Sequence, residues 1–394
     1  MWIIYSALSA AILTAQAVAA PTNSSASQCH DFMLDVPVVA TTYVLDILRV
    51  NNNIDAVNYA LDIDGRTSKN ATERVLGTTT ISDTFTVKAT FCTPSVANDK
   101  HILQILTHGL VVDSRYWDIE IDRANYSYVQ AAVDAGYSVL NYDRLGHGQS
   151  QKPDAYTIVQ GPLEVEILRG ITEMARNGTI SSPALPFVAP AFETVVHVGH
   201  SYGSFLTSAL LVAYPELSSG AVLTGYTITN SSAPGTSTVA MGFQYAATNN
   251  PDLFGDRGSG YIVPASVSQV QTGFYHRKNE SDPAGFTDDL LAYGEHIKQP
   301  LTVAEWVTIH GLLKLAPAPA YKGPLQFFLA ENDYLLCASD CKADYDLAIL
   351  GGAYPAVSDL DVYLQPGAGH GLTFHKNATA GYAVMMDFLA KNNL

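Results

Sequence analysis

The chain has 394 residues, of which 47% are hydrophobic and 15% are charged, so it is long enough for a large folded core and too apolar for a disordered protein. Its formal net charge is −16, with 21 Lys and Arg against 37 Asp and Glu. Nucleic acid is therefore a poor partner, because a phosphate backbone needs clustered Lys and Arg. The acidic surface is also weakly drawn to anionic membranes.

The first 20 residues predict a secretory signal peptide. The stretch WIIYSALSAAILTAQAVAA is apolar, then rich in small residues, and ends at Ala20 before Pro21, although it lacks an early Lys or Arg. The alternative is a membrane anchor, for which the apolar run is short. No later segment is long and apolar enough to span a bilayer, so we expect a secreted, extracellular protein with no stable membrane anchor.

Four cysteines and seven glycosylation motifs agree with export. An even cysteine count suits two disulfides in an oxidising compartment, and of the three connectivities we favour Cys29–Cys92 and Cys337–Cys341. The alternative is four free thiols. The N-x-S/T sequons begin at Asn23, Asn70, Asn125, Asn177, Asn230, Asn279 and Asn377, whereas composition alone would give roughly three. Bacterial secretion would leave these sites unmodified.

The expected elements, in chain order, change character after the first hundred residues. Residues 21–30 are rich in Ser and Asn and predict a flexible N-terminus, whereas residues 80–93 alternate in polarity and predict a half-buried antiparallel edge strand. Short apolar runs follow at 101–109, 136–143, 194–201, 220–227, 323–333 and 359–367, with helical patterns between most of them. This alternation predicts an α/β fold with a mostly parallel central sheet and helices on both faces. Ligands then bind beyond the carboxyl ends of the strands.

One interval, 228–322, lacks this alternation. It is rich in aromatic residues and includes residues 301–315, which predict an amphipathic helix. We interpret it as an inserted, largely helical cap between a first part of the core, 21–227, and a second part, 323–394. The alternative is an elaborated crossover that belongs to the core.

A serine between two glycines ends the third apolar run. In Gly199-His200-Ser201-Tyr202-Gly203, the glycines remove side chains that would collide where a strand turns sharply into a helix. That turn would present the Ser201 hydroxyl at the edge of the sheet. The backbone N–H of Tyr202 would then face a substrate oxygen that becomes negative. The motif alone occurs by chance, but a strand before it and a helix after it are the context that a nucleophile requires.

A nucleophilic serine needs a base, and the base needs an acid that orients it. His370 lies between two glycines on the loop after the last apolar run and is the expected base, with His375 as the fallback. Asp333 ends the fifth run and is the expected acid, with Glu331 and Asp340 as competitors. The chain order Ser, Asp, His is the one that this arrangement requires.

A second donor to the oxyanion is expected after an early strand. The first apolar run ends in His-Gly, and the backbone N–H of Leu110 can then face the oxyanion; the alternative is an ordinary strand–helix turn. In NYDRLGHGQS, residues 141–150, Asp143 and His147 could be mistaken for catalytic groups. We interpret this stretch as a structural, Gly-rich turn that Asp143 and Arg144 stabilise.

Together these motifs resemble the α/β-hydrolase family. The resemblance spans roughly residues 80–394, interrupted by the cap, and rests on His-Gly, D-R-x-G-x-G-x-S, G-H-S-Y-G, the late Asp and the G-x-G-H loop. It implies the α/β-hydrolase fold and a serine nucleophile. The roles above then go to Ser201, Asp333, His370 and the N–H groups of Leu110 and Tyr202. The Cys-rich start and the sequons are similar to those of secreted fungal members.

The resemblance does not imply a substrate, because the family is chemically broad. A nucleophilic Ser instead of Asp argues against epoxide hydrolases and dehalogenases, and the elbow lacks the G-G-S-W-G form of proline aminopeptidases. We therefore expect a serine hydrolase that cleaves a small carboxylic ester with an apolar portion and needs no metal or cofactor. The alternatives are an amidase or peptidase with the same triad and a hydrolase-like binding protein without catalysis. The sequence does not predict the oligomeric state.

Overall fold

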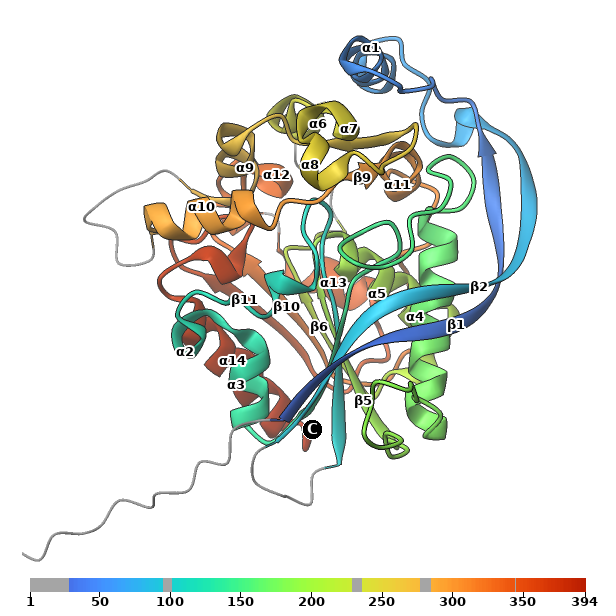
Figure 1. Ribbon diagram of the computed structural model, residues 1–394. Coiled ribbons are helices and arrows are strands. Elements are labelled where there is room, and N and C mark those ends of the chain that lie inside the picture. The colour runs from blue at the N-terminus through green and yellow to red at the C-terminus, as the bar shows by residue number, and fades with distance from the viewer. Residues whose placement is uncertain (1–27, 95–100, 229–235, 277–284, 344) are drawn as a thin grey trace, which may run out of the picture.

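The computed structural model describes residues 28–94, 101–228, 236–276, 285–343 and 345–394 (Figure 1). The predicted signal peptide, 1–20, and the sequons at Asn23, Asn230 and Asn279 lie outside these residues. Among the described helices, none combines the length and the apolar character that crossing a bilayer would need.

An eight-stranded sheet forms the centre of the molecule. Its strands are β1 (Gln28–Leu45), β2 (Val75–Thr93), β3 (Ile102–Thr107), β4 (Ser138–Tyr142), β5 (Thr194–His200), β6 (Gly220–Thr224), β10 (Leu325–Ala330) and β11 (Leu360–Gln365), in the order β1-β2-β4-β3-β5-β6-β10-β11. Within this sheet β4, β3, β5, β6, β10 and β11 run parallel, and β2 is antiparallel to both of its neighbours. Each of the six predicted apolar runs forms one of the parallel strands, because a strand covered on both faces needs apolar residues at nearly every position.

Helices cover both faces of this sheet. Figure 1 shows α3 (Tyr128–Asp134) and α14 (Ala378–Lys391) on one side, and α4 (Gly161–Asn177) and α5 (Tyr202–Ala213) on the other. The ends of α4 follow from local residues. Pro162 stands in its first turn, and Gly178 ends it with a φ of 64°. The strand order and the two helical layers are those of the α/β-hydrolase fold.

The first two strands form a long ribbon that extends well beyond the sheet. Gln28 pairs with Thr93 at one end and Leu45 with Val75 at the other, and α1 (Asn53–Asp64) lies at the far tip (Figure 1). The predicted flexible N-terminus is therefore wrong for residues 28–30, which belong to β1. Strand β1 also escaped the sequence analysis, although its apolar positions alternate with exposed ones from Phe32 onward.

The interval after β6 combines short helices with a second, three-stranded antiparallel sheet, β7-β8-β9. Its elements are α6 (Thr236–Met241), β7 (Gln244–Tyr245), α7 (Ala246–Asn249), α8 (Pro251–Phe254), β8 (Tyr261–Val263), α9 (Val267–Phe274), α10 (Asp288–His296), β9 (Leu301–Thr302) and α11 (Val303–Ile309). The small sheet was not predicted from the sequence. The predicted helix over 301–315 instead begins as a strand and ends at Ile309, two residues before Gly311 adopts a φ of 116°.

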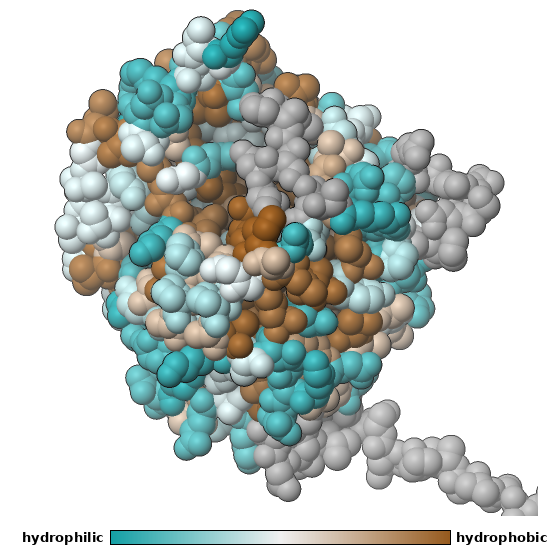
Figure 2. All heavy atoms as spheres, turned by 180° about the vertical axis from the view of Figure 1, so that it is seen from behind, coloured by the Kyte–Doolittle hydropathy of each residue, from teal (hydrophilic) through white to brown (hydrophobic). Residues whose placement is uncertain are grey.

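The remaining short helices belong to loops of the core: α2 (Arg123–Tyr126), α12 (Tyr334–Cys337) and α13 (Leu347–Ala353). Exposed apolar side chains are scattered over the surface, and Figure 2 shows hydrophobic residues gathered in the middle of one face among hydrophilic ones. On α1, the side chains of Ile54, Val57 and Leu61 are mostly exposed.

Candidate active site

Ser201 stands at the sharp turn between β5 and α5. Its backbone has φ 50° and ψ −119°, a conformation that a non-glycine residue adopts only when its surroundings impose it. The Ser201 N–H donates to the carbonyl oxygen of Thr224 at 2.8 Å, which fixes the turn to the end of β6.

The two glycines of the motif are required by close approaches of the backbone. A Cβ on Gly203 would lie 2.0 Å from the Thr107 carbonyl oxygen, and a Cβ on Gly199 would lie 2.7 Å from the Gly203 backbone. Any larger residue at either position would push α5 away from the sheet. The predicted steric reason for the G-x-S-x-G motif is therefore present in the packing of β3, β5 and α5.

His370 and Asp333 meet beyond the ends of β11 and β10. The His370 Nδ1 atom lies 2.5 Å from Asp333 Oδ2, and both side chains are buried. The other carboxylate oxygen, Asp333 Oδ1, accepts the Leu336 N–H at 3.0 Å at the start of α12. Both oxygens of the acid are thus held, and one of them orients the imidazole.

Both ring nitrogens of the alternative base, His375, are hydrogen-bonded to backbone groups. Its Nε2 atom accepts the Gly369 N–H at 3.0 Å, and its Nδ1 atom donates to the Gly371 carbonyl at 2.9 Å. Both nitrogens therefore bind the loop on either side of His370. The cap also holds this loop, because the Gly371 N–H donates to the Phe274 carbonyl at 2.7 Å.

The alternative acids lie away from the imidazole of His370. Glu331 forms an ion pair with Lys342 at 2.6 Å and accepts the Gly367 N–H, and Asp340 is exposed. A disulfide crosses the turn that carries Asp333, since Cys337 is bonded to Cys341. The second disulfide joins Cys29 and Cys92, which face each other across β1 and β2, so both favoured pairings are present.

Ser201 and His370, the expected nucleophile and base, line one cavity of about 830 Å³. Leu110 also contributes to its wall. The rest of the lining is mainly aliphatic and aromatic and comes from α5, from α12 and from the interval 228–322, including its residues 309–316. Among the described residues, no Asp or Glu lines it. Such a cavity suits an apolar ligand with one polar group at the wall.

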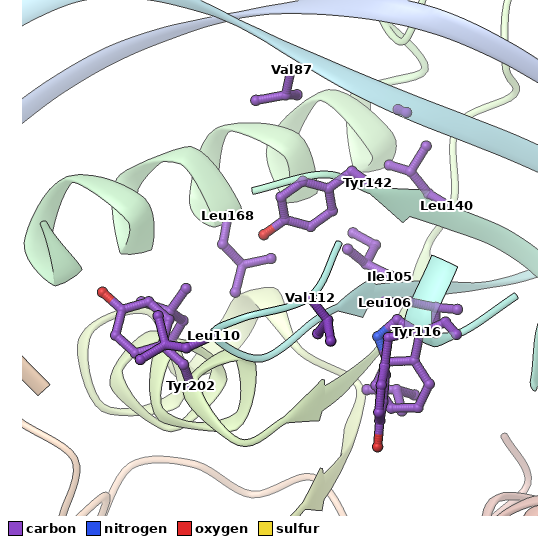
Figure 3. Close-up of a cluster of buried hydrophobic side chains, with 14 of the residues drawn as sticks. Val87, Ile105, Leu106, Leu110, Val112, Tyr116, Leu140, Tyr142, Leu168 and Tyr202 are labelled. Carbon is purple, nitrogen blue, oxygen red and sulfur yellow. The ribbon is translucent and has the colours of Figure 1, made fainter. Parts of the chain in front are cut away.

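The two expected oxyanion donors come from two different segments, the loop after β3 and the start of α5. Leu110 follows β3 and lines the cavity, and Tyr202 carries the first N–H of α5, a group that a helix leaves without an internal partner. The Tyr202 side chain is buried, and its hydroxyl donates to Glu164 Oε2 at 2.8 Å. Figure 3 shows Leu110 and Tyr202 as members of the same buried cluster.

The Gly-rich turn after β4 does not contribute to the wall of the cavity. Asp143 accepts the backbone N–H groups of Ser114 at 3.0 Å and Gln149 at 2.8 Å, and a Cβ on Gly148 would lie 2.1 Å from its carboxylate. His147 is buried and donates from Nδ1 to the Leu145 carbonyl. Neither group lines the cavity, in agreement with a structural interpretation of this turn.

A buried ion cluster was missed by sequence reasoning. Arg144 pairs with Glu164 of α4 and, at 2.7 Å, with Glu305 of α11, and all three side chains are buried. Burial raises the pKa of the Glu164 carboxyl well above its ordinary value and also raises the pKa of Glu305. Burial, and then the charge of Arg144, lower the pKa of His108 and His147, so both imidazoles are neutral.

Two further predictions concern groups outside the cavity. Among the described residues, no group of three or more His, Cys, Asp or Glu side chains is arranged to hold a metal ion. The Asn residues of the described sequons differ in their exposure to solvent. Asn70, Asn125 and Asn177 are exposed, whereas Asn377 is half-buried and its Nδ2 atom donates to the Pro366 carbonyl at 2.9 Å.

The fold combines a mainly parallel sheet with a sharp elbow between β5 and α5, and a fold by itself does not define an activity. The family follows from the sequence: the profile of the alpha/beta hydrolase family matches residues 104–383, and the chain belongs to that family. A search of curated proteins found no match.

Solved structures share the fold at low sequence identity. A thermophilic esterase from Thermogutta terrifontis, with malate bound, is 13% identical with a TM-score of 0.51, over 78% of this chain and 95% of that chain. A lipase in an open form is 18% identical with a TM-score of 0.50, over 78% and 95%. A protein from Mycobacterium tuberculosis is 18% identical with a TM-score of 0.51, over 79% and 95%. At these identities the likeness establishes the fold alone.

Proposed function

We propose that this protein is a serine hydrolase that cleaves a carboxylic ester through Ser201, His370 and Asp333. The observation that carries the proposal is that His370, which lines the same cavity as Ser201, is paired with the buried Asp333 at 2.5 Å. A hydroxyl, an imidazole and a buried carboxylate in this order are the parts of an acyl-transfer site.

The proposed reaction has two halves. The Ser201 oxygen attacks the ester carbonyl carbon while His370 takes the hydroxyl proton, and Asp333 keeps the imidazole oriented. The N–H groups of Leu110 and Tyr202 bind the negative oxygen of the tetrahedral intermediate. His370 gives its proton to the leaving alcohol, and a water molecule then releases the acid from Ser201 by the same steps.

An apolar acyl or alcohol group is the proposed occupant of the cavity. Its wall includes Phe205, Met241, Trp306, Leu313 and Leu335, and this surface has the character of a protein core. An apolar group gains about 25 cal/mol for each Å² that it buries there. Esters with a lipid-like or aromatic portion are therefore the proposed substrates.

The decisive experiment is labelling with a fluorophosphonate, which reacts with an activated serine. We expect the protein to be labelled at Ser201, and Ser201→Ala to lose labelling and to lower kcat about a thousandfold or more. Ser204→Ala is the matched control, because the Ser204 hydroxyl of α5 donates to the Thr224 carbonyl at the end of β6 and does not line the cavity. Unchanged ester turnover in purified Ser201→Ala would refute the nucleophile assignment.

Two alternative functions, an amidase or peptidase and a non-catalytic binding protein, predict different results in these experiments. Turnover of a matched ester and amide pair separates an esterase from an amidase or peptidase. A wild-type protein that is folded but neither labelled nor active would be a binding protein instead. A series of p-nitrophenyl esters from acetate to palmitate then reports which acyl length the cavity accepts.

Secretion is part of the proposal. It rests on the apolar, small-residue N-terminus before Pro21 and on the two disulfides, which form in oxidising compartments. The similarity of the cysteines and sequons to those of secreted fungal α/β-hydrolases also supports the proposal of secretion. Sequencing the N-terminus of protein recovered from the medium of its source tests it, with a start near Pro21 as the expected result.

A further inference from the structure

Side chains in and next to the buried cluster hold the carbonyl end of the peptide unit between Gly109 and Leu110. The Gly109 carbonyl oxygen accepts a hydrogen bond from His108 Nδ1 at 2.8 Å and another from Arg144 Nη2 at 3.3 Å. A trans peptide is planar, so its N–H points away from its carbonyl. Holding the Gly109 oxygen toward Arg144 therefore aims the Leu110 N–H in the opposite direction.

The other donor to that carbonyl, His108, is itself fixed by Arg144. The Arg144 backbone N–H donates to His108 Nε2 at 2.9 Å, which leaves the ring proton on Nδ1, where it binds Gly109. The guanidinium also donates from Nε to the His108 carbonyl at 3.1 Å. One arginine thus determines both the tautomer of His108 and the tilt of the peptide that follows it.

The same guanidinium reaches the residue that carries the other expected donor. It lies over the Tyr202 ring, 4.5 Å from the ring centre, and Tyr202 in turn donates its hydroxyl to Glu164. The residues of both expected oxyanion donors are therefore in contact with one charge cluster.

The cap supplies part of this cluster. Glu305 belongs to α11, and its Oε1 atom binds Arg144 while its Oε2 atom accepts the Thr302 N–H at 2.7 Å. Thr302 is bound to the core in turn, through its hydroxyl and the Val159 carbonyl at 2.9 Å. A buried guanidinium needs such partners, because an unpaired buried charge is very costly.

We propose that Arg144, held in place by Glu305 of the cap, is a positioning residue that aims the Leu110 N–H into the oxyanion hole. The cap then completes the catalytic geometry of the core in addition to enclosing the substrate. This inference rests on the proposed hydrolase function, since an oxyanion must form at Ser201. A purely structural cluster would affect folding but not the affinity for the tetrahedral state.

The test compares Glu305→Gln and Arg144→Lys with the wild-type protein on one p-nitrophenyl ester. We expect kcat to fall about tenfold or more in each, with KM within about twofold, because only the interaction with the developing oxyanion is weakened. A boronic acid, which forms a tetrahedral adduct with serine, should lose affinity by about the same factor. The carboxylic acid product should bind unchanged.

The matched control is the surface pair on α4. Arg169 binds Glu166 at 2.6 Å and is partly exposed, so Arg169→Lys and Glu166→Gln should change neither kcat nor boronate affinity. Should Arg144→Lys fail to fold, Glu305→Gln still decides, because it keeps the size of the side chain and removes the negative charge that holds Arg144.

The outcomes separate the two proposals. A variant with a lower melting temperature but unchanged kcat and boronate affinity would overturn this inference and leave the hydrolase function intact. A wild-type protein that is neither labelled by the fluorophosphonate nor active on any ester would overturn both. A rise in KM with kcat unchanged would mean that Glu305 acts on substrate binding, which also contradicts the inference.

Discussion

At the scale of single residues, sterics decide what the elbow can contain. The Cβ of any residue at position 203 would overlap the Thr107 carbonyl at 2.0 Å, and neither backbone can move without breaking β3 or α5. The strained φ of Ser201 is sustained by this packing and by its hydrogen bond to Thr224.

Gly203→Ala should therefore displace α5 from the sheet. We expect a loss of about 1–3 kcal/mol in the free energy of unfolding and at least a tenfold fall in kcat, because the serine moves with the helix. Urea unfolding and ester kinetics measure the two effects. Gly352→Ala, where a Cβ would meet nothing within 4 Å, is the control and should be nearly neutral.

His197 in β5 is a second residue whose behaviour follows from burial. It is fully buried between the hydroxyls of Ser218 and Thr172, each 2.9 Å from one ring nitrogen. Desolvation, and then the charge of Arg176, lower the pKa of its imidazole to about 3, against about 6.5 in an unfolded chain.

Stability should consequently fall as the pH decreases from about 6.5 toward 3, because in that window the unfolded chain binds a proton at His197 that the folded protein does not bind. One such group contributes a slope of about 1.4 kcal/mol per pH unit. His197→Gln should reduce the measured slope by about this amount when urea unfolding is followed between pH 6 and 4. An unchanged slope would contradict the assignment.

At the scale of elements, the loop after β10 is shaped by its short disulfide. The Asp333 carbonyl accepts N–H groups of Cys337 and Ser339, and Cys341 binds the Glu331 carbonyl. The disulfide, with a separation of only 4 residues, closes the turn whose first residue orients His370. The ribbon disulfide joins residues 63 positions apart and lies on β1 and β2, several strands from Ser201 in the strand order.

Removing each disulfide separately should affect stability and kcat differently: the short disulfide should matter more for kcat, and the long one more for stability. Replacing Cys337 and Cys341 by Ser should cost about 2 kcal/mol of stability and lower kcat, since Asp333 becomes less well fixed. Replacing Cys29 and Cys92 should cost about 4 kcal/mol, because a longer loop is released, and leave kcat nearly unchanged. Urea unfolding and ester kinetics on both double variants check the comparison, and equal effects on kcat would contradict it.

At the scale of the whole molecule, the N-terminal ribbon ties the sheet to the cap. Its turn binds the cap through the Gly260 N–H and the Val50 carbonyl at 2.9 Å. The Tyr59 hydroxyl of α1 donates to the Val303 carbonyl, also at 2.9 Å, at the start of α11. The helix that carries Glu305 is therefore held from outside by the ribbon and from inside by Arg144.

Tyr59→Phe should loosen this connection. It leaves the buried Val303 carbonyl without that donor, at a cost of about 1–3 kcal/mol, and hydrogen exchange should rise in α11 while β5 stays protected. Tyr382→Phe removes an equivalent bond to the Tyr126 carbonyl at 2.7 Å and should affect α2 and α14 instead. Exchange that rises equally everywhere would contradict a local role for the ribbon.

Much of the fold could be predicted because its signals are local. Each parallel strand is a short apolar run, and the elbow glycines are required by contacts that any strand–turn–helix of this type makes. Strand β1 was missed because its alternation lies beside a Ser- and Asn-rich stretch. The helix of α11 was predicted too long because the period of apolar residues continues past the point where Gly311 turns the chain.

The sequence by itself determined the parallel strands of the core, the turn at Ser201 and the small set of histidines and acids that could serve it, because these depend on neighbouring residues. The tertiary structure decided which of them meet. His370 is hydrogen-bonded to Asp333, whereas His375 is hydrogen-bonded to the backbone of the loop that carries His370. Arg144 pairs with Glu164 and Glu305, which lie 20 and 161 positions away in the chain. Such pairings depend on burial and on distances between remote segments, and no local pattern encodes them.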